Sequence, residues 1–161
     1  MADRDITKDV LRMFNYGLYV AAAQSPDGPR AATVSWVTQA SFEPRLVAVA
    51  MRKGTAICET AHASGRFALQ VVAVDQTDFA KAFFKFTQAG PDQIAGYHFS
   101  LTANGLPLFD VAAAWLECEV VEEADAAGDH AIFICSVLGS GVREPVRAAL
   151  ALRDTPWHYG G

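Results

Sequence analysis

The sequence has little charge, few cysteines and no long uninterrupted apolar segment. Its 161 residues carry a formal net charge of −5. A chain with this balance has no basic field that could follow a phosphate backbone, so nucleic-acid binding is disfavoured. Charged or turn-forming residues interrupt every apolar stretch before it reaches the length of a membrane span. We therefore expect neither a nucleic-acid-binding protein nor a membrane protein.

Cysteine use and the N-terminus favour a cytoplasmic protein. Cys58, Cys118 and Cys135 are widely spaced and odd in number, which excludes a CxxC redox or zinc site and disfavours a disulfide framework. We expect each to be a small buried hydrophobe. The polar segment from Met1 to Asp9 has neither the basic end nor the apolar stretch of a secretion signal.

Several motifs that would identify an enzyme class are also missing. The sequence contains no GxGxxG, GxxxxGK[ST], HExxH or GxSxG pattern, so a Rossmann fingerprint, a P-loop, a zinc-protease helix and a hydrolase elbow have no support. The four histidines lack metal-ligand spacing. We expect no metal site.

The apolar segments that are present predict an antiparallel β-barrel. A hydrophobic fraction of 52% and a length of 161 residues suit one folded domain over residues 1–161. About six strands, joined by hairpin-length turns and accompanied by two or three short helices, indicate an α+β fold centred on a closed or nearly closed barrel. The expected strands are Gly17–Ala23, Ala31–Val37, Arg45–Met51, Phe67–Val74, Ala113–Glu123 and Ala131–Gly139.

Two polar segments are candidates for ligand binding. The segment Thr33–Ser41 offers four hydroxyls, an amide and an indole, which suit a phosphate or the edge of a heterocycle, although threonine is also simply a good strand former. The segment Arg52–Thr55 places two cations, a glycine and a hydroxyl before an expected helix, whose free backbone N–H groups attract anions. An ordinary capped helix beside solvated cations is the alternative.

Histidine and phenylalanine supply weaker signals. His130 follows Gly128 and Asp129 at the start of an apolar strand, where it could orient a ligand or simply end a turn. Phe79, Phe83 and Phe86 have helical spacing, and we expect them in the core rather than around a cofactor.

In this order and spacing, the segments resemble the flavin reductase-like family, the FMN-binding split barrels that include NAD(P)H:flavin oxidoreductases. The likeness covers about Phe14 to Tyr159. Its markers are Tyr16–Val20, Ala32–Pro44, Ser64–Leu69, Leu106–Leu108, Ala114–Cys118 and Gly128–Phe133. The C-terminal tail Asp154–Gly161 differs from the commoner tail of the family, which has a single late tyrosine.

The resemblance implies a homodimer of six-stranded antiparallel barrels with FMN, or else FAD, near the subunit interface. The implied flavin-contacting residues are Thr33, Val34, Ser35, Trp36 and Thr38 along the ring and ribityl chain, Arg52, Lys53, Gly54 and Thr55 at the phosphate, and Phe67, Ala68, Phe84 and Lys85 beside the cofactor. His130 matches a histidine on the nicotinamide side of the ring.

The implied reaction is hydride transfer from NAD(P)H to the flavin, with electrons passed to an oxygenase, to oxygen or to a small electron-transfer protein. Two alternatives stay open: a non-enzymatic FMN-binding electron-transfer module that a protein partner reduces, and a barrel that binds another planar ligand such as haem.

Overall fold

The computed structural model describes residues 4–125 and 127–160, which form short helices and antiparallel strands. The helices are α1 (Ile6–Leu11), α2 (Ala56–Ser64), α3 (Thr77–Ala82) and the single 3-10 turn η1 (Leu152–Asp154). The strands are β1 (Tyr19–Ser25), β2 (Gly28–Val34), β3 (Val37–Ser41), β4 (Leu46–Arg52), β5 (Arg66–Val71), β6 (Gln93–Ile94), β7 (Tyr97–Leu101), β8 (Pro107–Phe109), β9 (Ala114–Ala124) and β10 (His130–Val142). The α+β class predicted from the sequence is confirmed. In the described part of the chain, no helix has the length and apolarity needed to cross a membrane.

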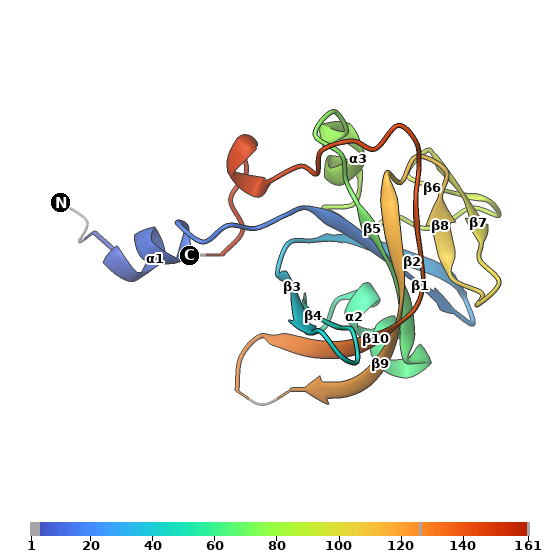
Figure 1. The fold of residues 1–161 in the computed structure, drawn as a ribbon, viewed down its shortest axis with the longest axis horizontal. Helices are drawn as coiled ribbons and strands as arrows, with labels where there is room; N and C mark the ends of the chain where they lie inside the picture. Colours follow the sequence, from blue (N-terminus) through green and yellow to red (C-terminus); the bar gives the residue numbers. More distant parts are fainter. Residues whose placement is uncertain (1–3, 126, 161) are drawn as a thin grey trace.

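Seven of the strands form one antiparallel sheet in the order β2-β1-β5-β9-β10-β4-β3, and β6, β7 and β8 form a second, small sheet. Figure 1 shows the large sheet strongly curved, with α2 inside the curve and the small sheet and α3 at one side. The strands β9 and β10 are the longest, and their ladder shifts register between Ile134 and Cys135 and again between Val137 and Gly139. Such irregularities increase the local bend of a sheet.

The chain passes from one edge of the large sheet to the other through only two residues, Ser35 and Trp36. Val34 pairs with Tyr19 of β1, whereas Val37 pairs with Val49 of β4. The bend is tight, because the Val37 N–H donates to the Ser35 carbonyl at 3.2 Å. Since β2 and β3 are the two edge strands, the sheet has to curl until its edges nearly meet.

This bend corrects the predicted strand count. The sequence predicts one strand over Ala31–Val37 and six strands in a barrel, but the structure divides that segment at Ser35 and Trp36 and has seven strands in the large sheet. Among the described residues, no strand pairing joins β2 to β3 or β4, so the sheet is curled and open at one seam.

Local chemistry accounts for the elements beside this seam. The Ser25 hydroxyl donates to the Gly28 carbonyl at 2.6 Å and closes the β1–β2 hairpin, where Gly28 takes a φ of 109°. Thr55 caps α2 by accepting a hydrogen bond from the Cys58 N–H at 3.4 Å. Gly65 ends that helix with a φ of 69°, a left-handed conformation that glycine adopts without strain.

Two apolar cores lie on the two faces of the large sheet. The first, inside the curl, includes Phe67, Phe133 and the α2 residue Ile57. The second packs α3 and the small sheet against the outer face and contains Phe79 and Phe83. Phe86, which the helical spacing placed with them, is 60% exposed because α3 ends at Ala82.

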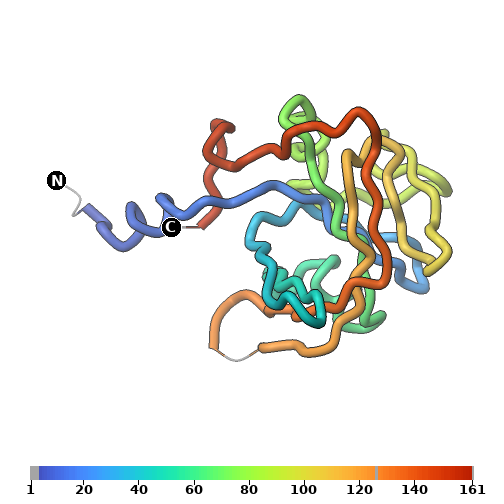
Figure 2. Tube along the Cα trace, in the orientation of Figure 1, coloured from blue at the N-terminus to red at the C-terminus, as the bar shows by residue number. Residues whose placement is uncertain are grey.

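The two ends of the chain lie side by side. The Leu152 N–H donates to the Tyr16 carbonyl at 2.8 Å, and the Arg153 guanidinium donates to Asn15 Oδ1 at 2.7 Å. Figure 2 shows both segments leaving the curled sheet on the same side, with α1 extending farthest. None of the α1 residues is buried. The C-terminal tail from Thr155 onward is therefore held close to the seam.

Candidate functional site

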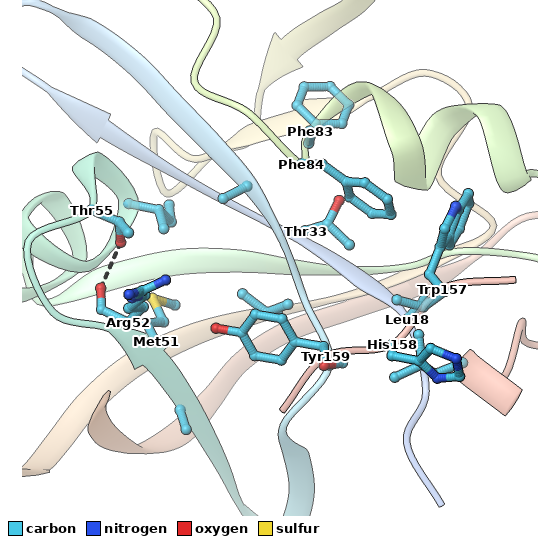
Figure 3. Close-up of a pocket in the computed structure, with 16 residues that line it drawn as sticks. Leu18, Thr33, Met51, Arg52, Thr55, Phe83, Phe84, Trp157, His158 and Tyr159 are labelled. Carbon is cyan, nitrogen blue, oxygen red and sulfur yellow. Dashed lines mark hydrogen bonds between the residues drawn. The ribbon is translucent and has the colours of Figure 1, made fainter. Parts of the chain in front are cut away.

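A cavity of about 390 Å³ lies at the seam between β2 and β4. Its volume is within the ordinary range of small-molecule sites. Segments that are distant in the sequence meet around it, among them β2, β4, the start of α2 and the C-terminal tail, as Figure 3 shows. Its walls are formed by Leu18, Ala32, Thr33, Val34, Ser35, Ala50, Met51, Arg52, Thr55, Ile57, Phe83, Phe84, Leu152, Trp157, His158 and Tyr159.

One end of the cavity is suited to an anion. Arg52 at the end of β4 and Thr55 at the start of α2 both line it, and the Thr55 hydroxyl donates to the Arg52 carbonyl at 2.7 Å. The first N–H groups of α2 have no partner within the helix, and the helix dipole favours negative charge at this end. A guanidinium, a hydroxyl and a helix N-terminus therefore converge at one point of the wall.

The remaining wall is largely apolar and aromatic. The ring of Phe84 meets that of Trp157 edge-on, with centroids 4.7 Å apart. Thr33 lines this part too, but its hydroxyl donates to the Ala80 carbonyl at 2.6 Å and so fixes the end of α3 against β2. Apolar walls with one anion-binding end suit an aromatic heterocycle that carries a phosphate.

A second cavity, of about 320 Å³, lies beside the first and is lined in part by Trp36, Asp129 and His130. The rings of Trp36 and His130 lie in contact at a tilt of 33°, with centroids 4.3 Å apart. His130 also contacts Asp129 and Tyr159 through its two ring nitrogens, each at 2.7 Å. Tyr159 lines the first cavity, so these side chains form the partition between the two.

Electrostatics in the partition follow from these contacts. The hydrogen bond from His130 holds the pKa of the Asp129 carboxyl below its usual range. Burial raises the pKa of the Tyr159 phenol, which therefore keeps its proton near neutral pH. The partition combines a carboxylate, an imidazole and a neutral phenol.

The structure brings together about half of the residues that the sequence singled out. Those that line the first cavity are Thr33, Val34, Ser35, Arg52, Thr55 and Phe84. Trp36 and His130 line the second cavity. The others lie outside both linings: Thr38, Lys53, Gly54, Phe67, Ala68 and Lys85.

Contacts of these outlying residues explain their placement. The Lys53 ammonium forms an ion pair with Asp125. Phe67 and Ala68 are fully buried in β5, and the ring of Phe67 packs edge-on against Phe133. Lys85 is exposed to solvent. For Phe67 and Ala68, only the backbone is a candidate for contact with a ligand, as the resemblance implies.

The C-terminal tail is the part of the site that the sequence analysis did not identify. Trp157, His158 and Tyr159 all line the first cavity. Gly160 packs so closely on Trp36 that an added Cβ would stand 2.7 Å from the indole Cζ2 atom. Three consecutive aromatic or imidazole side chains in a polar tail were the available signal.

Comparison with known proteins places the chain in a family. Residues 11–158 match the family described as the flavin reductase like domain. The putative diflavin flavoprotein A 2 of Nostoc sp. is 32% identical over 144 residues, which are 89% of this chain and 24% of that protein. This chain thus spans about a quarter of the length of that relative.

Two solved structures are similar over most of their length. The styrene monooxygenase flavin reductase of Pseudomonas putida S12 has a TM-score of 0.74 and 30% sequence identity, covering 88% of this chain and 89% of that one. The NADH:FAD oxidoreductase of Streptomyces globisporus C-1027, in complex with NAD and FAD fragments, has a TM-score of 0.77 and 26% identity, covering 91% and 85%.

Proposed function

Because the chain belongs to the flavin reductase-like family, we propose that it binds FMN in the seam cavity and transfers hydride from NAD(P)H to that flavin. The observation that carries the proposal is the cavity itself, in which Arg52, Thr55 and the start of α2 form an anion site at the end of an apolar slot. That arrangement matches a planar ring joined to a single terminal phosphate.

The residues present fit a flavin in a further respect. The Trp36 indole Nε1 is buried, and among the described residues it has no hydrogen-bond partner. A buried N–H without an acceptor is costly, so a ligand atom or a water molecule is expected beside it. Trp36 lines the second cavity and directly follows Ser35, which lines the seam cavity.

The proposed roles follow from the position of each residue. Arg52, Thr55 and the first backbone N–H groups of α2 hold the phosphate. Thr33, Val34 and Ser35 lie along the ring, and the backbones of Phe67 and Ala68 support it from β5. His130 orients the nicotinamide. Bound flavin supplies the redox chemistry, while the protein binds it, orients it and excludes water.

For the hydride donor and the acceptor, the support comes from the similar proteins. One similar structure is named an NADH:FAD oxidoreductase and another is the flavin reductase of a styrene monooxygenase. We therefore propose a nicotinamide donor and an oxygenase acceptor, with oxygen or a small electron-transfer protein as the other acceptors. We propose FMN rather than FAD because Arg52 is the one guanidinium that the described residues place in the cavity lining, and it suits a single phosphate.

A single series of spectra tests the proposal. The purified protein is loaded with FMN, its visible spectrum is recorded under anaerobic conditions, and NADH or NADPH is added. Bleaching of the flavin band is expected within seconds to minutes. Bound flavin that bleaches only on adding a protein reductant would favour the electron-transfer module instead. Mass analysis of the extracted cofactor distinguishes FMN from FAD.

A further inference from the structure

Asp129, His130 and Tyr159 form a continuous hydrogen-bonded chain across the partition. Asp129 Oδ1 lies 2.7 Å from His130 Nδ1, and His130 Nε2 lies 2.7 Å from the Tyr159 hydroxyl. Both distances are short for hydrogen bonds that involve a ring nitrogen. The three groups come from the loop before β10, from β10 itself and from the C-terminal tail, so the fold has to be complete before the chain forms.

The three side chains of this hydrogen-bonded chain differ in their exposure to solvent. The Asp129 side chain is 79% exposed and Tyr159 is 42% exposed, whereas the His130 side chain between them is only 11% exposed. His130 is covered by the indole of Trp36 on one side. Tyr159 faces the seam cavity, and Figure 3 shows its ring between Arg52 and the pair Trp157 and His158. The hydrogen-bonded chain therefore runs from an exposed carboxylate, through a largely buried imidazole, to a phenol that lines the seam cavity.

Proton positions along the chain are constrained by chemistry. A carboxylate can only accept, so Asp129 accepts the Nδ1 proton of His130. In the neutral imidazole, Nε2 then accepts from the Tyr159 hydroxyl. In the imidazolium, Nε2 carries a proton and donates to the Tyr159 oxygen, which frees the phenol proton for a group in the cavity. Protonation of His130 thus decides where the phenol proton points.

The charged groups around His130 suit such a path. Arg52 of β4 is paired with His130 in the sheet register. Lys53 donates its backbone N–H to the Asp129 carbonyl at 2.9 Å, while its ammonium pairs with Asp125. The depressed pKa of Asp129 and the raised pKa of Tyr159 keep the first an acceptor and the second a donor near neutral pH.

We propose that Asp129, His130 and Tyr159 carry protons between solvent and the seam cavity, with Tyr159 as the member that faces the ligand. The inference rests on the proposed function. NAD(P)H gives up a hydride, which is two electrons and one proton, and leaves as NAD(P)⁺. The oxidised flavin takes up that hydride and one more proton to become the neutral reduced flavin. The phenol donates this second proton, His130 replaces it, and solvent restores His130 beside Asp129.

The first test needs no flavin. Protein labelled with ¹⁵N-histidine is compared by NMR with Tyr159→Phe, and His130 is assigned from the resonances lost in His130→Gln. We expect Tyr159→Phe to shift the Nε2 resonance of His130 while Nδ1 stays protonated, because Asp129 still accepts from it. An unchanged Nε2 resonance would show that the phenol does not contact the imidazole, and would overturn the proposal.

The second test follows the proton directly. FMN-saturated protein is mixed with NADH in a weakly buffered, anaerobic solution near pH 6, and flavin bleaching and a pH indicator are recorded together. In the parent protein, proton uptake is expected to keep pace with bleaching. In Tyr159→Phe it should fall behind by about a hundredfold, the lower end of the effect of a positioned general acid. Tyr97→Phe, which removes a phenol from the outer core, is the matched control and should behave as the parent does.

The outcomes separate the two proposals. If the parent protein is bleached and Tyr159→Phe takes up its proton as fast as Tyr97→Phe does, the proton path is overturned while the reductase function stands. If NAD(P)H does not bleach the parent protein at all, the reductase function fails, and the path fails with it as a route for this proton. Flavin affinity is measured for each variant, so that weaker flavin binding is not mistaken for slower proton transfer.

Discussion

Replacing Arg52 with glutamine should weaken the binding of FMN much more than the binding of riboflavin. Arg52 lines the anion end of the cavity beside Thr55, whereas the neighbouring Lys53 pairs with Asp125 and lies outside the lining. Among residues 4–125 and 127–160, no carboxylate lies within ion-pair distance of the Arg52 guanidinium. Its charge is therefore available to a ligand. Riboflavin has the same ring and ribityl chain as FMN but no phosphate, so it isolates this contact.

The size of the effect follows from the contact and its exposure. A charge-assisted hydrogen bond contributes about 1.5–3 kcal/mol. Arg52 is solvent-exposed, and screening by water places the contribution at the lower end of this range. Since each 1.4 kcal/mol is a tenfold change in affinity, Arg52→Gln should weaken FMN by about tenfold. The affinity for riboflavin should change little, because riboflavin offers no anion to the Arg52 guanidinium.

Quenching of flavin fluorescence measures both affinities in the same buffer. Lys53→Gln is the matched control, because it removes the same charge one residue further along the chain and should leave the FMN affinity nearly unchanged. Added salt should weaken FMN in the parent protein more than in Arg52→Gln. Equal losses for FMN and riboflavin, or a loss in Lys53→Gln as large as in Arg52→Gln, would refute this placement of the phosphate.

Three further predictions concern stability, titration and assembly. Gln70 is fully buried and forms hydrogen bonds with the Pro107 carbonyl and the Phe109 N–H. Gln70→Leu should therefore lower the free energy of unfolding, measured in urea, by about 2–4 kcal/mol, and an unchanged midpoint would contradict this. Hydrogen bonding to Glu123 raises the pKa of His62. Their pairing therefore stabilises the fold at pH values below the pKa of His62 in the unfolded chain, and this contribution is lost as the pH rises through the raised pKa of the folded protein. Glu123→Gln should lower the titration midpoint of His62 measured by NMR. We propose that the exposed Val10 and Phe14 of the N-terminal arm pack on a second copy in the homodimer that the family resemblance implies. Changing both to Asp should then convert the dimer to a monomer in light scattering, and an unaltered mass would count against this interface.

Elements fixed by local chemistry could be predicted from the sequence. The β1–β2 hairpin follows from the turn formers between Ser25 and Gly28, and the end of α2 follows from Gly65. The anion end of the cavity could be predicted for the same reason, because its cation, its hydroxyl and the helix start lie within one turn of each other in the sequence. The sequence could not predict whether Arg52 or Lys53 faces the cavity. That depends on Asp125, which lies far along the chain and pairs with Lys53.

The aromatic tail could not be placed from the sequence for a related reason. Its position depends on Trp157 meeting Phe84 and on Tyr159 meeting His130, and both contacts join segments that are distant in the chain. Local propensity carries no information about such pairs. Only the concentration of aromatic side chains in a polar segment indicated that the tail would have to pack against something.

The bend at Ser35 and Trp36 links the wrong strand count to the position of the site. Neither glycine nor proline interrupts the segment Ala31–Ser41, so sequence pattern alone favours one continuous strand there. A continuous strand would stay at one edge of the sheet. Because the chain instead crosses between the edges, β2 and β4 face each other across an unpaired seam, and the cavity lies in that seam. The same crossing brings the Trp36 side chain against His130. The departure from regular strand pairing is therefore what makes room for a ligand and sets the imidazole beside it.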